Sequence, residues 1–302
     1  MNQTRLYERR MGRWLRRRVP AALAEFILFT AKQAWACLFG ASLLAAIIGT
    51  KLFWQSDWPL ARYDALFLFA LALQAIFLRF NLETWAEARA ILIFHLTGTA
   101  MEWFKVSAGS WVYPEAAFFK IYGVPLFSGF MYASVGSYMA RVIRLFDMQF
   151  APFPPMAVHF GLAICVYVNF FAHHFIWDAR YILFAATLVF YVRTRIWFRI
   201  GQSWYWMPLP VAAGFSSIFL WLAENIGTLT GTWIYSGQSL TELVSMAKLG
   251  SWYLLLYVAF ATVTLVDRSP VRYSPVAPAR KPPARRSRSA RLRSRQACST
   301  PG

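Results

Sequence analysis

Long stretches without a charged residue recur along the chain, and they restrict it to a fold that lipid can surround. Eight such stretches run through residues 33–50, 65–78, 90–101, 121–140, 148–177, 181–192, 200–223 and 249–266. Several reach the ~18 apolar residues that a membrane span needs. The two short ones are flanked by Arg and Lys side chains that can reach the interface, so helices over 88–106 and 179–196 are long enough. The pattern predicts an all-α, polytopic membrane helical bundle of about eight spans.

The charge of the chain lies mainly at its two ends. The formal net charge is +18, and 58% of the residues are hydrophobic, above the roughly 45–50% of soluble domains. Arginine at the ends of spans is a topology signal, and it attracts anionic lipid headgroups. We therefore expect membrane lipids as partners, with anionic headgroups at both basic termini, and no nucleic-acid partner.

The distribution of arginine in the short loops predicts the orientation. Arginines crowd the N-terminus, the loops near 79–89, 141–144 and 193–199, and the C-terminal tail. The other loops carry one or two basic residues each, so eight spans with both termini in the cytoplasm fit a bacterial inner membrane. The expected parts are a basic N-terminus and interfacial helix (1–32), a membrane domain (33–267) and a disordered basic tail (268–302).

A twelve-residue pattern occurs twice. Glu102–Tyr113 and Glu224–Tyr235 both read Glu, six residues, Gly, Ser or Thr, Trp, a β-branched residue and Tyr. A looser echo pairs Trp58 to Tyr63 with Trp177 to Tyr181. Four spans in each half would give a parallel 4+4 internal duplication about an axis along the membrane normal. The halves are about 33–145 and 150–267.

The repeated glutamates are the main candidates for chemistry. Glu102 would lie roughly 20 Å into a core about 30 Å thick, with His95 and Thr99 on the same helical face. A carboxylate at that depth has to be paired, protonated or directed into a polar cavity. Glu224 occupies the matching position. The two glutamates either cap the following loops through backbone amides or form a proton-exchanging or substrate-binding pair.

The aromatic residues after each glutamate are candidates for substrate binding. Trp111 and Tyr113 follow Glu102, and Trp233 and Tyr235 follow its counterpart. Such rings suit the interfacial belt, and two copies tied to glutamates suggest a loop packed over the bundle.

A metal site is the weaker alternative near residue 174. His173, His174 and Asp178 cluster at one predicted helix end, and His174 and Asp178 are spaced to bind one ion. Isolated His–Asp pairs at helix ends are more often hydrogen-bonded structure. The chain has four histidines, too few for a membrane di-iron centre, and it carries no phosphate loop, GxSxG or HExxH motif.

These segments resemble the domain-of-unknown-function family 817, a set of bacterial integral membrane proteins without an assigned activity. The resemblance covers about 20–267 and rests on residues 102–115, 123–132, 169–181 and 224–235. A fainter likeness is to membrane carotenoid hydratases, through Glu102, Gly109, Tyr113, Gly123 and Pro125.

Two functions fit these observations. The first is a membrane enzyme acting on a lipid or isoprenoid, with Glu102 as general acid or base and the aromatic loops as an apolar pocket. The alternative is a small-solute carrier in which Glu102 and Glu224 couple protons.

Overall fold

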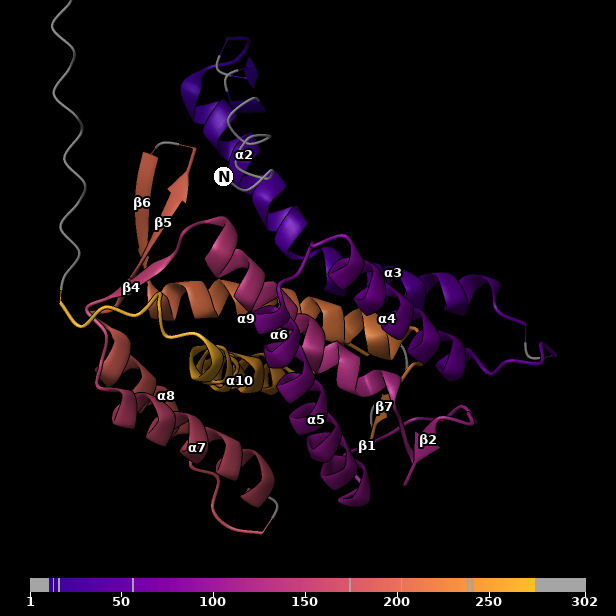
Figure 1. Ribbon diagram of the computed structural model, residues 1–302. Coiled ribbons are helices and arrows are strands. Elements are labelled where there is room, and N and C mark those ends of the chain that lie inside the picture. The colour runs from indigo at the N-terminus through magenta and orange to yellow at the C-terminus, as the bar shows by residue number, and fades with distance from the viewer. Residues whose placement is uncertain are drawn as a thin grey trace, which may run out of the picture.

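The computed structural model describes residues 11–274, apart from 13, 16, 56, 174, 202, 238, 240 and 241. The described part is mostly helical, as expected (Figure 1). Its helices are α2 (Ala21–Ala36), α3 (Leu38–Phe53), α4 (Arg62–Arg79), α5 (Trp85–Ser107), α6 (Phe127–Leu145), α7 (Met156–Ala172), α8 (Arg180–Tyr191), α9 (Leu209–Leu229) and α10 (Met246–Val266).

The chain is not all-α, because short strands lie between the helices. They are β1 (Trp111–Val112), β2 (Lys120–Ile121), β3 (Val124–Pro125), β4 (Gln149–Ala151), β5 (Arg195–Ile200), β6 (Ser203–Pro208) and β7 (Ile234–Tyr235). The apolar stretches 148–177 and 200–223 therefore begin in strands and become helical only later. In β5 the residues Ile196, Phe198 and Ile200 are buried, and the residues between them are more exposed, which is the two-residue period of a strand.

The membrane character of the helices is uneven. By length and composition, α9 and α10 can each cross a membrane, and both have 21 residues, about 31 Å. Helices α2 and α3 pass the same test only as a pair, and they are bent by 66° at their junction. Among the described residues this gives two candidate spans, or three if the bent pair is one span.

One end of the molecule carries the three-stranded sheet β4–β5–β6, to the left in Figure 1. Helix α2 reaches it through Lys32 Nζ, which donates to the carbonyl of Arg199 at 3.0 Å. The chain after α10 reaches it as well, since Phe150 exchanges backbone hydrogen bonds with Pro270 and Arg272, both 2.9 Å. Residues 270–272 thus belong to the folded body, although the tail was expected to begin at 268.

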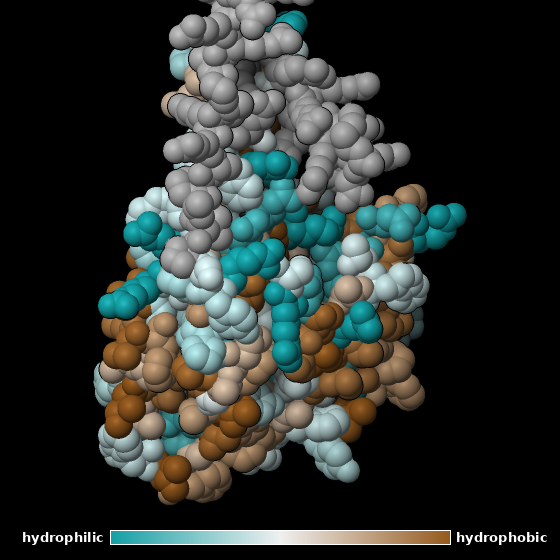
Figure 2. Space-filling model, turned by 60° about the vertical axis from the view of Figure 1, so that its left-hand side comes forward, coloured by the Kyte–Doolittle hydropathy of each residue, from teal (hydrophilic) through white to brown (hydrophobic). Residues whose placement is uncertain are grey.

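Hydrophilic and hydrophobic surfaces are separated on the face shown in Figure 2. Hydrophilic side chains gather in the upper part of the described surface, and hydrophobic side chains dominate the lower part. An apolar surface of this kind is what lipid would cover.

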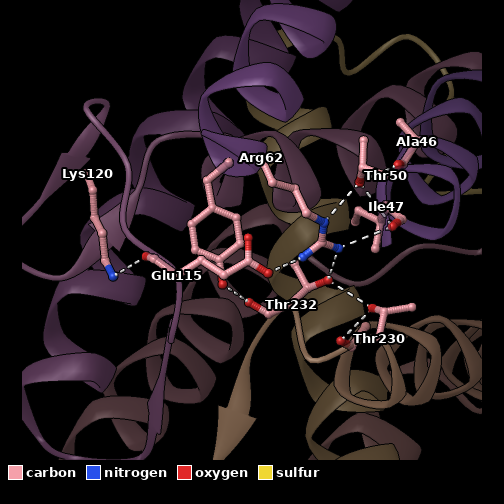
Figure 3. A network of polar contacts seen from close by, with 10 residues as sticks. Ala46, Ile47, Thr50, Arg62, Glu115, Lys120, Thr230 and Thr232 are labelled. Carbon is pink, nitrogen blue, oxygen red and sulfur yellow. Dashed lines mark hydrogen bonds and ion pairs between the residues drawn. The ribbon is translucent and has the colours of Figure 1, made fainter. Parts of the chain in front are cut away.

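The opposite end holds the β1–β7 and β2–β3 strand pairs, together with a buried arginine (Figure 3). The Arg62 guanidinium pairs with Glu115 at 2.6 Å and donates to Thr50 Oγ1 at 3.1 Å. It also donates to the Ile47 carbonyl at 3.2 Å and to Thr232 Oγ1 at 3.0 Å. Arg62 therefore ties α3, α4 and the loop before β2 to the loop after α9.

Candidate functional site

Glu102 lies in the second half of α5 and is 2% exposed. Its Oε2 atom accepts hydrogen bonds from the indole of Trp111 at 2.8 Å and the hydroxyl of Tyr113 at 2.9 Å. Its Oε1 atom accepts one from the hydroxyl of Tyr132, on α6, at 2.8 Å. Three uncharged donors thus satisfy this buried carboxyl group.

Glu224 has a closely similar environment in α9 and is 8% exposed. Its Oε1 atom accepts from the indole of Trp233 at 3.2 Å and from the hydroxyl of Tyr235. Its Oε2 atom accepts from the indole of Trp252, on α10, at 2.9 Å. In both copies, one oxygen binds the following loop and the other binds an aromatic residue of the following helix.

The glycine of each repeat explains why the loop returns to its own glutamate. Gly109 and Gly231 stand just past the ends of α5 and α9, with φ of 69° and 65°. The next amide donates back to a carbonyl in the last helical turn, at 2.9 Å for Ser110 and 3.0 Å for Thr232. Because a positive φ strains residues with a side chain, glycine favours this helix stop.

The two loops also pair with each other. Strands β1 and β7 are antiparallel, with Trp111 opposite Tyr235 and Val112 opposite Ile234. The rings of Trp111 and Tyr235 meet edge to face, with centroids 5.5 Å apart. The pairing brings both carboxyl groups into one cluster, so the predicted substrate-binding aromatics do lie together, with their polar atoms directed at the glutamates.

The capping interpretation of the glutamates changes in one respect. The observed donors of both glutamates are indole and phenol side chains, whereas backbone amides were expected. The glutamates do hold the loops in place. The third donor, however, is chemically different in the two copies. Tyr132 on Glu102 can donate or accept a proton, whereas Trp252 on Glu224 can only donate its N–H.

A cavity of about 50 Å³ lies beside this cluster, and both Tyr132 and Trp252 line it. Their ring centroids are 6.2 Å apart. The remaining walls are largely apolar, with side chains such as Phe94, Met101, Val135, Leu220 and Leu256. Tyr132 is therefore the polar link between Glu102 and an apolar cavity.

The other residues predicted on the face of Glu102 pack against α6. Thr99 donates to the His95 carbonyl at 2.7 Å, and the His95 ring lies 4.5 Å from that of Phe130. A Cβ at Gly129 would come within 2.5 Å of His95 Nδ1 and 2.4 Å of Thr99 Oγ1. A glycine that lets two helices approach closely is typical of membrane helix pairs. The contact of His95 with Gly129 therefore favours a packing role for His95.

The weak metal candidates are mostly engaged in local structure. His173 Nδ1 lies 3.0 Å from the Asn169 carbonyl. Asp178 accepts from Asn169 Nδ2 at 3.0 Å and pairs with Arg180 at 3.2 Å. His174 is outside the described residues. Within the described part, no group of three or more His, Cys, Asp or Glu residues could hold a metal ion.

Several polar residues of the interior were not singled out from the sequence. Tyr132 and Trp252 are the third donors to the two glutamates. Arg141 forms a fully buried ion pair with Glu83 at 2.7 Å, near the other end of α6. In the sequence Arg141 stands among the loop arginines, and no local pattern identifies its partner Glu83, which lies in the turn before α5.

The described residues define a predominantly helical protein with two or three candidate membrane spans and two buried glutamates held by aromatic side chains. The chain belongs to the family described as "Protein of unknown function (DUF817)", whose family model matches residues 25–260. It is similar to the uncharacterized protein YoaT of Bacillus subtilis (strain 168), with 39% identity over 256 residues, 83% of this chain and 96% of the relative. The resemblance to family 817 is confirmed; neither match shows the likeness to carotenoid hydratases. No solved structure matches the chain.

Proposed function

We propose that helices α3 to α10 are eight membrane spans, with both termini in the cytoplasm of a bacterium and anionic lipid headgroups around the basic ends. The contacts between loops support this arrangement. The loops after α3, α5, α7 and α9 meet one another or the helix ends beside them, as Arg62 does with Glu115 and Thr232. The loops after α6 and α8 and the chain after α10 meet at the β4–β5–β6 sheet.

Two features bear on this proposal. Helix α8 has only 12 residues, about 18 Å, so the bilayer must thin locally or its flanking Arg side chains must extend to the interface. The similar environments of Glu102 and Glu224 support a parallel duplication of four spans, because the same helix stop and the same Trp and Tyr donors from the following loop recur in both halves.

Reporter fusions test the topology. Positions 10, 84, 147 and 275 should be cytoplasmic, and positions 56, 112 and 238 should face the outside. Alkaline phosphatase and green fluorescent protein fused at these positions give opposite signals on the two sides. Termini on opposite sides of the membrane would overturn both the eight-span topology and the parallel repeat.

We further propose that the protein is a membrane enzyme that moves a proton on a lipid or isoprenoid substrate. The observation that carries this proposal is the position of Tyr132, which lines an apolar cavity and bonds Glu102 at 2.8 Å. A cavity of about 50 Å³ holds only a few atoms of a substrate. The rest of the substrate's hydrocarbon chain would therefore lie in the bilayer, beside the exposed Thr97 that lines the cavity.

The proton would pass through Tyr132. In the acid direction, its hydroxyl proton moves to the substrate while the protonated Glu102 carboxyl returns a proton to the phenol oxygen. In the base direction, both transfers run in reverse. Correctly placed acid–base groups accelerate such reactions by about 10²–10⁴-fold. Glu224 lacks this route because its cavity-lining partner is the Trp252 indole, so its role here is to hold the second loop.

A small-solute carrier is the second candidate. It is favoured by the position of the two glutamates, which come from opposite halves and meet across the β1–β7 pair. A carrier of this kind would move one half against the other and exchange protons at Glu102 and Glu224.

Comparison of a deletion strain with its parent separates the two functions. The enzyme proposal predicts that one lipid accumulates and a related lipid disappears, with solute uptake unchanged. Untargeted lipid analysis and uptake assays on the same cultures provide both readouts. An unchanged lipid profile with loss of uptake of one solute would reject the enzyme and support the carrier.

A further inference from the structure

A second, smaller cavity of about 20 Å³ adjoins the first, and both are lined by Leu255 of α10. Its walls include the polar residues Asn169, His173, Arg180 and Ser251. The second cavity lies between the end of α7 and the beginning of α10, near Lys248.

Three basic side chains, Lys105, Arg180 and Lys248, lie near this cavity, and Arg180 lines it and is paired with Asp178. Lys105 Nζ lies 4.2 Å from the ring centroid of Phe170, another wall residue. Arg180 Nη1 lies 3.5 Å from the carbonyl of Ala247, the neighbour of Lys248. Lys105 is within electrostatic range of both Lys248 and Arg180. The cations therefore form one cluster, although they come from three different helices.

Lys248 is the member of this cluster most available for a ligand. Its Nζ atom lies 3.9 Å from the ring centroid of Tyr235 and 5.3 Å from that of Trp111. Among the described residues, these aromatic faces are its contacts, and its ammonium group makes no hydrogen bond or ion pair. The nearby glutamates Glu102 and Glu224 are already satisfied by uncharged donors.

We propose that the cluster of Lys105, Arg180 and Lys248 binds the phosphate of a phosphorylated lipid or isoprenoid whose first few carbons occupy the larger cavity. This inference rests on the proposed enzyme function and names the class of its substrate. Lys and Arg are the residues that bind phosphate, through charge-assisted hydrogen bonds. An anionic head at this end would place the first carbons of the chain beside Tyr132.

Binding requires a small rearrangement of the long side chains. A cavity of about 20 Å³ holds one water molecule and is too small for a phosphate. The Lys248 ammonium group is carried on a flexible four-carbon stem and can turn from the aromatic faces toward an anion.

Ligand binding to the purified full-length protein in a neutral detergent tests the proposal. The probes are farnesyl phosphate, farnesol and inorganic phosphate, with native mass spectrometry and thermal stability as readouts. Farnesyl phosphate should bind tightest, and Lys248→Gln should weaken it by about tenfold, the effect of a charge-assisted hydrogen bond. Lys248→Arg should largely retain binding. Lys51→Gln, which removes an exposed lysine at the end of α3, is the matched control and should bind normally.

Three other outcomes of the binding experiment would each overturn the proposal. Equal binding of farnesol and farnesyl phosphate, or no binding of either, would exclude a phosphate site. Binding of inorganic phosphate as tight as that of farnesyl phosphate would exclude a lipid ligand. If Lys248→Gln does not accumulate, Arg180→Gln provides the same test. Glu102→Gln should bind farnesyl phosphate normally, so loss of the proton-transfer function and loss of the phosphate site are measured separately.

Discussion

Replacing Glu102 with glutamine should reduce activity by at least about 100-fold while the protein still accumulates and inserts normally. Glutamine cannot exchange a proton, but its geometry suits the site. Its carbonyl oxygen can accept from Trp111 and Tyr113, and its amide can donate to the oxygen of Tyr132. The stability cost should therefore be within about 1 kcal/mol. Complementation of the deletion strain, with protein levels measured beside it, checks both statements.

The matching substitution in the second repeat should behave differently. In Glu224→Gln the amide of the glutamine would face the indole N–H of Trp252, and both groups are donors. This leaves a buried donor unsatisfied, at a cost of about 1–3 kcal/mol, with little direct effect on proton transfer. Glu242→Gln, at an exposed position between β7 and α10, is the control that should change neither property. Full complementation by the Glu102→Gln, Glu224→Gln double variant would end the catalytic and proton-coupling interpretations together.

Replacing Gly227 with alanine should destabilise the protein by about 1–3 kcal/mol. A Cβ at this position would lie 1.8 Å from the nearest ring atom of Trp233, and two more ring atoms lie within 2.4 Å. The indole would have to leave its place over α9, and its hydrogen bond to Glu224 would be lost. Thermal unfolding followed by near-ultraviolet circular dichroism should show a lower midpoint and an altered tryptophan signal.

Gly214 provides the control on the same helix. No atom lies within 4 Å of a Cβ built at Gly214, so alanine there should be neutral or stabilise the helix by up to about 1 kcal/mol. If both substitutions changed the thermal stability equally, the effect would come from replacing a glycine within a helix. The packing of Trp233 against Gly227 would then not be its cause.

The duplicated pattern was the most informative part of the sequence. It identified Glu102 and Glu224, and the same residues specify the helix stops and the aromatic donors. Within each copy, the glutamate, the glycine and the aromatic donors of the loop lie within twelve residues, so their spacing determines the geometry. Tyr132 is 30 residues from Glu102, and only the packing of α5 on α6 brings the two together. Such a contact has no local signature in one sequence.

The strands show a second limit of the hydrophobic pattern. The charge-free stretch 200–223 was expected to form a span, yet it begins in the β5–β6 hairpin and includes the whole of β6 (Ser203–Pro208). Charge-free runs report that a segment avoids water, but periodicity decides between helix and strand. Ile196, Phe198 and Ile200 alternate with more exposed residues in the structure, but Trp197 between them is also apolar, so the hydrophobic pattern of the sequence does not show this alternation.

Transfer of solvent deuterium to a lipid carbon tests the central claim, that Glu102 moves a proton on an apolar substrate. Membranes from the deletion strain, which would contain the accumulated substrate, are incubated in D₂O with the purified protein. Mass spectrometry then follows the lipid that differed between the deletion strain and its parent. The proposal predicts deuterium on carbon in the product or the recovered substrate with the wild-type protein, and none with Glu102→Gln. Equal incorporation with both proteins, or a lipid profile that neither protein changes, would contradict the claim.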